Sequence, residues 1–453
     1  MRTTPFDSKL YSELYGTSEM KAIWDDTSIV QSWLDTEIAL AETQAELGLI
    51  PAEAAIAIGK HARVDIVDWD SLSAETVRTG MAIKPLVDQV CAQGGDLVER
   101  YFHWGTTTQD ILDTGQALRL RRSSQLLMKQ LSVLLKRLMS MAVTHRLTPM
   151  VGRTNAQDAQ PTTWGLQVSS YLGEFVRHTT RLLDMKERVC VGMLGGAVGT
   201  LASQGERGLE VRNRLMAKLG LTTPKGAWNG SQDAVVELVQ LCGLVLGSLA
   251  RLGNDIACLS RTSIGEVREA TGDATSSTMP HKANPRGANM LQAFSRLGAM
   301  YAGGALNMMD QVDVRSASMR MTSWSIVPES LLLVSASLER AAELLDTLVV
   351  NPHRMLANFG HSRHRVMSEA VMMRLAAKVG RKRAYQMVQR AIQSDSGGEL
   401  ALSDLLLADQ EVRGHLDAEA IRDACNPENY LGASGMLVDE AVESAEAVLR
   451  SLG

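Results

Sequence analysis

The chain has 453 residues, of which 45% are hydrophobic and 21% charged, so it can fill a sizeable core and is neither disordered nor collagen-like. Its 46 basic and 51 acidic residues give a formal net charge of −5 without long same-sign runs, which argues against a nucleic-acid-binding surface. Five scattered cysteines without a CxxC pair argue against a disulfide framework or a zinc site, and no apolar signal segment stands at the N-terminus. We therefore expect a cytoplasmic protein with reduced thiols and no metal or cofactor.

Residues that favour helices dominate the chain, which has only 11 prolines and 4% aromatic residues. An amphipathic helix is predicted for residues 28–47, because Gly48 suits the position just after a helix end. Between residues 116 and 148 there is neither glycine nor proline. Within that stretch, apolar residues recur at alternating spacings of 4 and 3, as in a coiled-coil seam: Leu127, Leu131, Leu134, Leu138 and Met141.

Residues 233–264 are apolar on nearly all sides, which predicts a helix at the centre of a bundle. The most apolar run in this segment, residues 241–250, is roughly half the length needed to cross a bilayer. Further long helices are predicted for residues 160–190, 287–309 and 325–349. A monomer would leave much apolar helix surface uncovered, so we expect self-association.

The pattern predicts an all-α protein with three domains. Residues 1–100 form an N-terminal helical domain, residues 101–350 a central long-helix bundle, and residues 351–453 a C-terminal helical domain. The glycine-rich stretch at 192–200 has no preceding strand and lacks the glycine spacing that cradles a pyrophosphate. We interpret it as a tight connection between helices, and no P-loop, HExxH or EF-hand pattern occurs.

Three polar segments are expected at the ends of long helices: residues 103–110, 152–161 and 275–285. In a bundle such ends can converge, and their backbone N–H groups and hydroxyls can form an anion site. Asp110, in the first segment, and Asp158, in the second, are expected to cap helices. In the third segment Pro280 and Pro285 restrain the residues before them, so a shaped loop is predicted that can aim polar groups.

The segment from Ser276 to Pro285 resembles the signature loop of the fumarase/aspartase superfamily, Gly-Ser-Ser-x-Met-Pro-x-Lys-x-Asn-Pro. Seven fixed positions match, and Thr275 stands where the family has glycine. The segments at 103–110 and 152–161 resemble two further family segments, and the likeness covers essentially the whole chain. Within the superfamily the chain is most similar to the 3-carboxy-cis,cis-muconate cycloisomerase branch, with adenylosuccinate lyase next.

The resemblance implies a three-domain fold whose signature loop spans residues 272–290 and whose long helices form a bundle shared in a homotetramer. It implies active sites shared between subunits and a small polycarboxylate substrate, with no nucleic-acid or membrane partner. The superfamily removes a proton beside a carboxylate while an amine or alkoxide leaves the next carbon, or runs the reverse addition. By resemblance Ser276 is the base. His103 is our first candidate for the acid, with His281 and water as alternatives, and a leaving group that needs no proton is the remaining alternative. The implied substrate-binding residues are Thr107, Thr108, Arg153, Asn155, Gln157, Ser277, Met279, Lys282, Asn284 and Arg315.

The chain departs from the family pattern where the leaving group would be bound. Asn155 stands where many members have a histidine that serves as general acid, and Ser231 replaces a glutamine. In the cycloisomerase branch a His-Glu-Arg run precedes a tryptophan and a glutamate, whereas here Arg315 survives and is followed by Arg320 and Thr322. A lactonisation like that of 3-carboxymuconate is the first candidate reaction. A C–N lyase that releases fumarate from an N-substituted aspartate is the second, and a catalytically silent scaffold is the alternative from another class.

Overall fold

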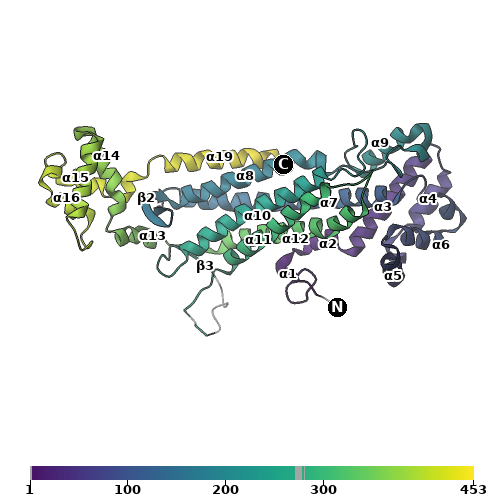
Figure 1. The fold of residues 1–453 in the computed structure, drawn as a ribbon, viewed down its shortest axis with the longest axis horizontal. Coiled ribbons are helices and arrows are strands. Elements are labelled where there is room, and N and C mark those ends of the chain that lie inside the picture. The colour runs from purple at the N-terminus through teal and green to yellow at the C-terminus, as the bar shows by residue number, and fades with distance from the viewer. Residues whose placement is uncertain (1–2, 271–277, 280, 453) are drawn as a thin grey trace. The chain divides into compact units, whose positions relative to one another are not determined.

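The computed structural model of the protein describes residues 3–270, 278, 279 and 281–452. Its residues cluster into two compact units. Unit 1 comprises residues 1–130, 179–246 and 294–337, and unit 2 comprises residues 131–178, 247–293 and 338–453. Helices make up most of both units, and over the described ranges only two two-stranded ribbons accompany them (Figure 1). The all-α prediction is confirmed, while the three-domain division stays a prediction.

Five long helices each contribute residues to both units. The leucines predicted to form a seam are at most 4% exposed, so they are core residues as the spacing indicated. The helix that carries them starts at Thr108, before the stretch that lacks glycine and proline. The five helices are α7 (Thr108–Thr144), α8 (Trp164–Val189), α10 (Asp233–Leu259), α11 (Arg286–Ala305) and α12 (Ala317–Thr347).

Shorter helices make up the remainder of unit 1. The predicted amphipathic helix is α3 (Asp26–Glu46), and Gly48 follows it with a φ of +68°, as a residue after a helix end requires. Trp33 and Leu34 of this helix are buried in a core shared with neighbouring short helices. The other helices are α1 (Ser12–Tyr15), α2 (Ser18–Trp24), α4 (Ala52–His61), α5 (Trp69–Thr79), α6 (Ile83–Tyr101) and α9 (Gly208–Leu219).

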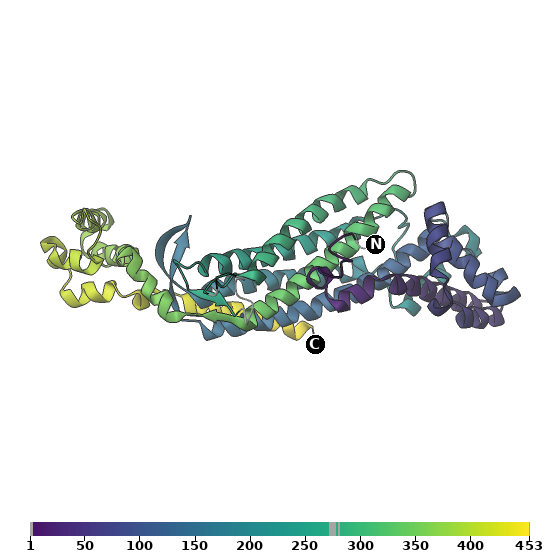
Figure 2. The same cartoon turned by 90° about the horizontal axis from the view of Figure 1, so that it is seen from below.

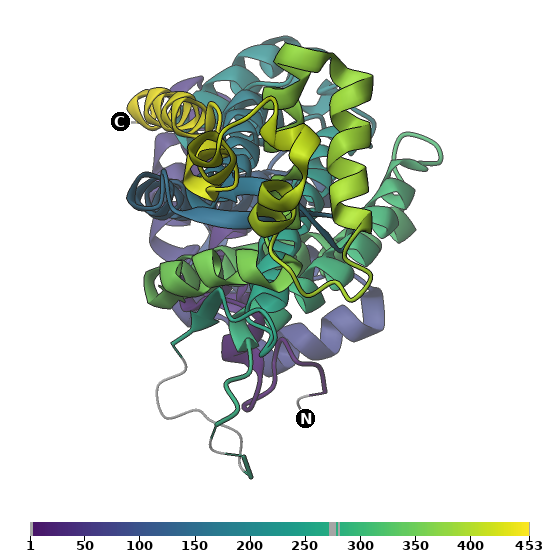
Figure 3. The same ribbon diagram turned by 90° about the vertical axis from the view of Figure 1, so that its left-hand side faces the viewer.

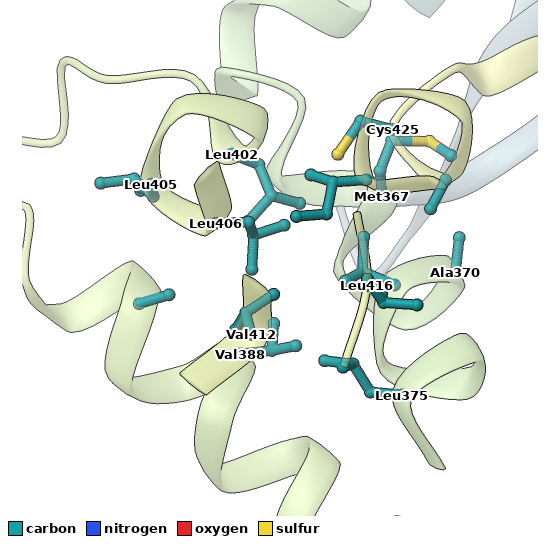
Figure 4. Close-up of a cluster of buried hydrophobic side chains, with 14 of the residues drawn as sticks. Met367, Ala370, Leu375, Val388, Leu402, Leu405, Leu406, Val412, Leu416 and Cys425 are labelled. Atoms are coloured by element: carbon teal, nitrogen blue, oxygen red, sulfur yellow. The ribbon is translucent and has the colours of Figure 1, made fainter. Parts of the chain in front are cut away.

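The C-terminal part of unit 2 is a cluster of short helices around its own apolar core. Met367, Leu375, Val388 and Leu406 point toward one another in this core (Figure 4). Two of the helices, α14 (Ser368–Val379) and α15 (Arg381–Gln393), pack against each other and are drawn in green in Figure 3. The cluster also contains α16 (Leu402–Ala408), α17 (Gln410–Arg413) and α18 (Ala418–Ala424), while α13 (Pro352–Asn358) precedes it and the longer α19 (Ser434–Ser451) follows it.

A β-hairpin stands where the sequence suggested a polar helix end. Strands β1 (Pro149–Thr154) and β2 (Gln157–Thr163) pair antiparallel and are visible as blue arrows in Figure 2. The two residues between them, Asn155 and Ala156, have φ values of +51° and +61°, which fit a tight two-residue hairpin turn. The expectation of a helix end at residues 152–161 is therefore wrong, and the helix predicted from residue 160 starts at 164.

A second ribbon pairs β3 (Val267–Glu269) with β4 (Leu348–Val350) in unit 2. It places a buried acidic residue, Glu269, at the entry to the signature loop. Both carboxylate oxygens of Glu269 accept hydrogen bonds of 2.9 Å, from the backbone N–H groups of Gly287 and Ala288 at the start of α11. The two ends of the loop are thus fastened together through one side chain.

Among the described residues, α10 is long and apolar enough, by length and composition alone, to cross a membrane. Half of its most apolar window is buried inside the protein. The same composition is required of the central helix of a bundle, as the sequence predicted.

Candidate active site

The N-terminus of α7 is held by the buried carboxylate of Asp110. This carboxylate accepts hydrogen bonds from the backbone N–H of Thr107 at 3.1 Å, of Gly195 at 2.9 Å and of Gly196 at 3.0 Å. The bond to Thr107 closes the first turn of the helix, so the prediction that Asp110 caps a helix is confirmed. The same prediction for Asp158 is wrong, because this residue lies in strand β2. Burial raises the pKa of Asp110, although these donors act to lower it. Thr107 and Thr108 consequently lie at the positive end of the helix dipole.

His103 lies just before this helix end, in a left-handed conformation with a φ of +58°. Its Nδ1 is 2.5 Å from Oε1 of Glu37, whose side chain is only 4% exposed. Burial of the imidazole acts to lower its pKa, but the hydrogen bond and charge of Glu37, with the charge of Asp110, outweigh this effect. The pKa of His103 is therefore raised, which favours the protonated form that a general acid requires.

Two arginines from the segment before and into α12 reach the same region of unit 1. Arg315 Nη2 donates to the hydroxyl of Thr107 at 3.3 Å, and Arg320 Nη1 donates to Oε1 of Gln109 at 2.6 Å. The amide nitrogen of Gln109 donates in turn to Oδ1 of Asp113 at 2.5 Å. Burial raises the pKa of Asp113 to about 6, against the lowering effects of Gln109 and both arginines.

Ser231, one of the family departures, belongs to the same neighbourhood. It lines a cavity of about 40 Å³ together with Asp113, Trp228 and Gln232. Gly230 has a φ of +76°, and a Cβ at this position would lie 2.6 Å from the backbone oxygen of Val314. Glycine is therefore needed for residues 228–231 to pack against the segment that carries Arg315.

In unit 2 the hairpin is fastened by Arg153. Its Nη1 and Nη2 donate to the two carboxylate oxygens of Glu266 at 2.8 and 2.7 Å, and its Nε donates to Asp158 at 3.2 Å. Asn358 Nδ2 donates to the same buried Glu266 carboxylate at 2.6 Å. The guanidinium of Arg153 is thus occupied by two carboxylates, and Asn155 at the hairpin tip is exposed.

The described end of the signature loop lines a basic groove of about 750 Å³ in unit 2. Lys282 and Asn284 contribute to its wall together with Arg261, Arg268 and His281. A groove of this size suits a small ligand, and its charge suits an anion.

Met279 is exposed near the described end of the loop. Ser276 and Ser277 lie outside the described residues, so their assignment stays a prediction.

A family model described as lyase matches residues 14–296. The chain belongs to the fumarase/aspartase superfamily of lyases. A second family model, adenylosuccinate lyase C-terminus, matches residues 365–441. The resemblance inferred from the signature loop is confirmed.

Relatives with several different named reactions match along nearly the whole chain. The N-acetyl-S-(2-succino)cysteine lyase of Dickeya dadantii is 33% identical over 445 residues, which is 97% of each chain. The trans-aconitate decarboxylase 1 of Mycosarcoma maydis is 34% identical over 433 residues, covering 95% of this chain and 88% of that one. The solved structure of the 3-carboxy-cis,cis-muconate lactonizing enzyme from Pseudomonas putida is 34% identical, with a TM-score of 0.93, covering 97% of this chain and 100% of that one.

The candidate catalytic and substrate-binding residues that the family resemblance implied fall into two groups, one in each unit. Unit 1 holds His103, Thr107, Thr108 and Arg315, and it brings Thr107 and Arg315 into contact. Unit 2 holds the others that the structure describes. There Arg153 and the Lys282–Asn284 pair line separate grooves, and Gln157 is exposed at the start of β2.

Sequence reasoning assigned no role to five residues that support these groups. Glu37 orients His103, Gln109 and Asp113 adjoin Arg320, and Glu266 and Glu269 fix the hairpin and the loop. No local signal marks the last two, because the segment around them is polar and also contains Arg261, Arg268 and Asp273.

Proposed function

We propose that this enzyme catalyses a reversible β-elimination or addition on a small polycarboxylate, with a 3-carboxy-cis,cis-muconate cycloisomerase-like reaction as the first candidate. The observation that carries the proposal is the loop from Ser276 to Pro285, whose Lys282 and Asn284 line a basic groove of a size suited to a small anion. A soluble, cytoplasmic homotetramer is part of the proposal. Active sites shared between subunits are also part of the proposal.

In the elimination direction, Ser276 takes a proton from the carbon beside a substrate carboxylate. The electrons of the broken C–H bond pass into the carboxylate as an enediolate, and Lys282 and Asn284 stabilise its developing charge. These electrons then form the double bond as the bond to the leaving group on the next carbon breaks. His103 supplies a proton to the leaving group, a role that the raised pKa caused by Glu37 supports.

A second candidate reaction is a C–N elimination that releases fumarate from an N-substituted aspartate. It shares the proton-abstracting step and differs in the leaving group, which is an amine. The amide of Asn155 cannot deliver a proton at neutral pH, so this reaction also depends on His103. A catalytically silent scaffold is the alternative from another class, and the intact Ser276, Lys282 and Asn284 weigh against it.

The test is turnover by wild type and Ser276→Ala on carboxymuconate and on a panel of N-substituted aspartates, followed by ultraviolet absorbance of the conjugated alkene. We expect turnover of one class by wild type and its loss in Ser276→Ala, with an unchanged oligomer mass in solution. Turnover retained by Ser276→Ala would contradict the proposed base. Absence of turnover on both classes would contradict the two named reactions and favour the scaffold.

A further inference from the structure

Arg315 and Arg320 are two cations that form no direct ion pair with a carboxylate among the described residues, although the charge of Asp113 acts on both. Neither forms an ion pair within the described ranges of the chain, where more than twenty other ion pairs occur. Arg315 has a single hydrogen bond of 3.3 Å to the hydroxyl of Thr107. Arg320 donates to Gln109 and makes a weak 3.5 Å contact with the sulfur of Met81, while its buried Nε has no partner among the described residues.

Gln109 explains why Arg320 stays unpaired although Asp113 is close. The amide oxygen of Gln109 accepts from Arg320 and its amide nitrogen donates to Asp113, so the glutamine side chain stands between the cation and the carboxylate. A direct Arg–Asp pair would neutralise the guanidinium and use its donors. The inserted amide instead holds the guanidinium in place and leaves donors for an anion.

The surroundings of the two guanidinium groups suit a carboxylate. Arg315 is in contact with the hydroxyl of Thr107, which stands at the positive end of the 37-residue helix α7. Burial lowers the pKa of Arg320, the charge of nearby Asp113 acts to raise it, and the like charge of Arg315 lowers it further. A bound anion would remove this repulsion while using donors that are otherwise unpaired.

We propose that Arg320 is a specificity-determining residue which, with Arg315 and Thr107, binds a third carboxylate of the substrate. This inference rests on the proposed function and deepens it, because it assigns the substrate to the tricarboxylates. Residues of the signature loop would bind the two substrate carboxylates nearest the reacting carbons. 3-Carboxymuconate is itself a tricarboxylate, and Arg320 stands where the cycloisomerase pattern has a tryptophan, so what is specific to this chain is the residue that binds the third carboxylate.

The experiment measures binding of two saturated acids to the intact oligomer by titration calorimetry. Propane-1,2,3-tricarboxylate contains succinate with one added carboxymethyl group, so the ratio of their dissociation constants isolates the third carboxylate. We expect the tricarboxylate to bind wild type more tightly, and Arg320→Met to weaken its binding about tenfold or more while changing succinate binding less than threefold. Arg320→Lys, which keeps the charge, should retain part of the preference.

Arg78→Met is the matched control, because Arg78 forms an exposed ion pair with Glu75 and should leave both constants unchanged. The inference would be overturned if Arg320→Met weakened binding of the tricarboxylate and of succinate equally, so that the ratio of their dissociation constants stayed as in wild type. Inorganic phosphate that binds more tightly than the tricarboxylate, in an Arg320-dependent way, would also overturn the assignment to a carboxylate. The proposed reaction fails separately, through turnover that survives Ser276→Ala, and that result would leave the two binding ratios as they are.

Discussion

The buried ion pair between Arg153 and Glu266 should control the stability of the hairpin. The Glu266 side chain is fully buried and accepts two hydrogen bonds from Arg153 and one from Asn358. Glu266→Gln keeps the shape of the side chain but removes its charge, leaving the half-buried guanidinium with only Asp158. Because breaking a buried pair costs about 3–5 kcal/mol and Arg153 is 22% exposed, we expect a loss of about 3 kcal/mol in unfolding free energy.

The matched control is Glu75→Gln, which makes the same chemical change in an exposed pair. Arg78 and Glu75 are 69% and 42% exposed, so this change should cost less than about 1 kcal/mol. Urea unfolding followed by circular dichroism compares the two variants at one protein concentration. The reasoning would be refuted if both variants shifted the unfolding midpoint equally.

Two further predictions concern unit 1 and the α7–α8 contact. In the folded protein the pKa of Asp113 is about 6, above its usual 3.8. As pH rises, the Asp113 carboxyl therefore loses its proton at a lower pH in the unfolded chain than in the folded protein, which favours unfolding. Between pH 4 and 7 the unfolding free energy of wild type should therefore fall by up to about 3 kcal/mol relative to that of Asp113→Asn. The difference between their melting temperatures should grow over this range. A constant difference would refute the burial argument. A Cβ at Gly165 would lie 2.6 Å from the backbone oxygens of both Ala142 and His145, so Gly165→Ala should lower the melting temperature by several degrees. Gly59→Ala, whose Cβ meets nothing closer than 4.0 Å, should be neutral or stabilising, and equal effects of the two changes would contradict the packing argument.

The long helices could be predicted from sequence because their signals are local. The leucine spacing in residues 127–138 and the absence of glycine and proline after residue 116 are enough to define most of α7. The hairpin at residues 149–163 could not be predicted in this way. Its strands are short and show no regular alternation of apolar and polar residues, and the contact that fastens it joins Arg153 to a residue 113 positions away.

The site shows the same division between local and distant signals. The motifs identified Thr107 and Arg315, and the structure places them in contact. The role of Glu37 depends on a hydrogen bond to His103, 66 positions along the chain, and that of Gln109 depends on Arg320, 211 positions away. No pattern within a single segment carries such information.

The most direct test of the central claim mixes two inactive variants, Ser276→Ala and Arg315→Met, and measures turnover of the substrate found in the panel. Each variant removes one half of the proposed shared site. If Ser276 of one subunit acts on a substrate held by Arg315 of another, subunit exchange should build some complete sites and restore turnover. Mixed oligomers, verified by native mass spectrometry, that remain as inactive as either variant alone would contradict the account.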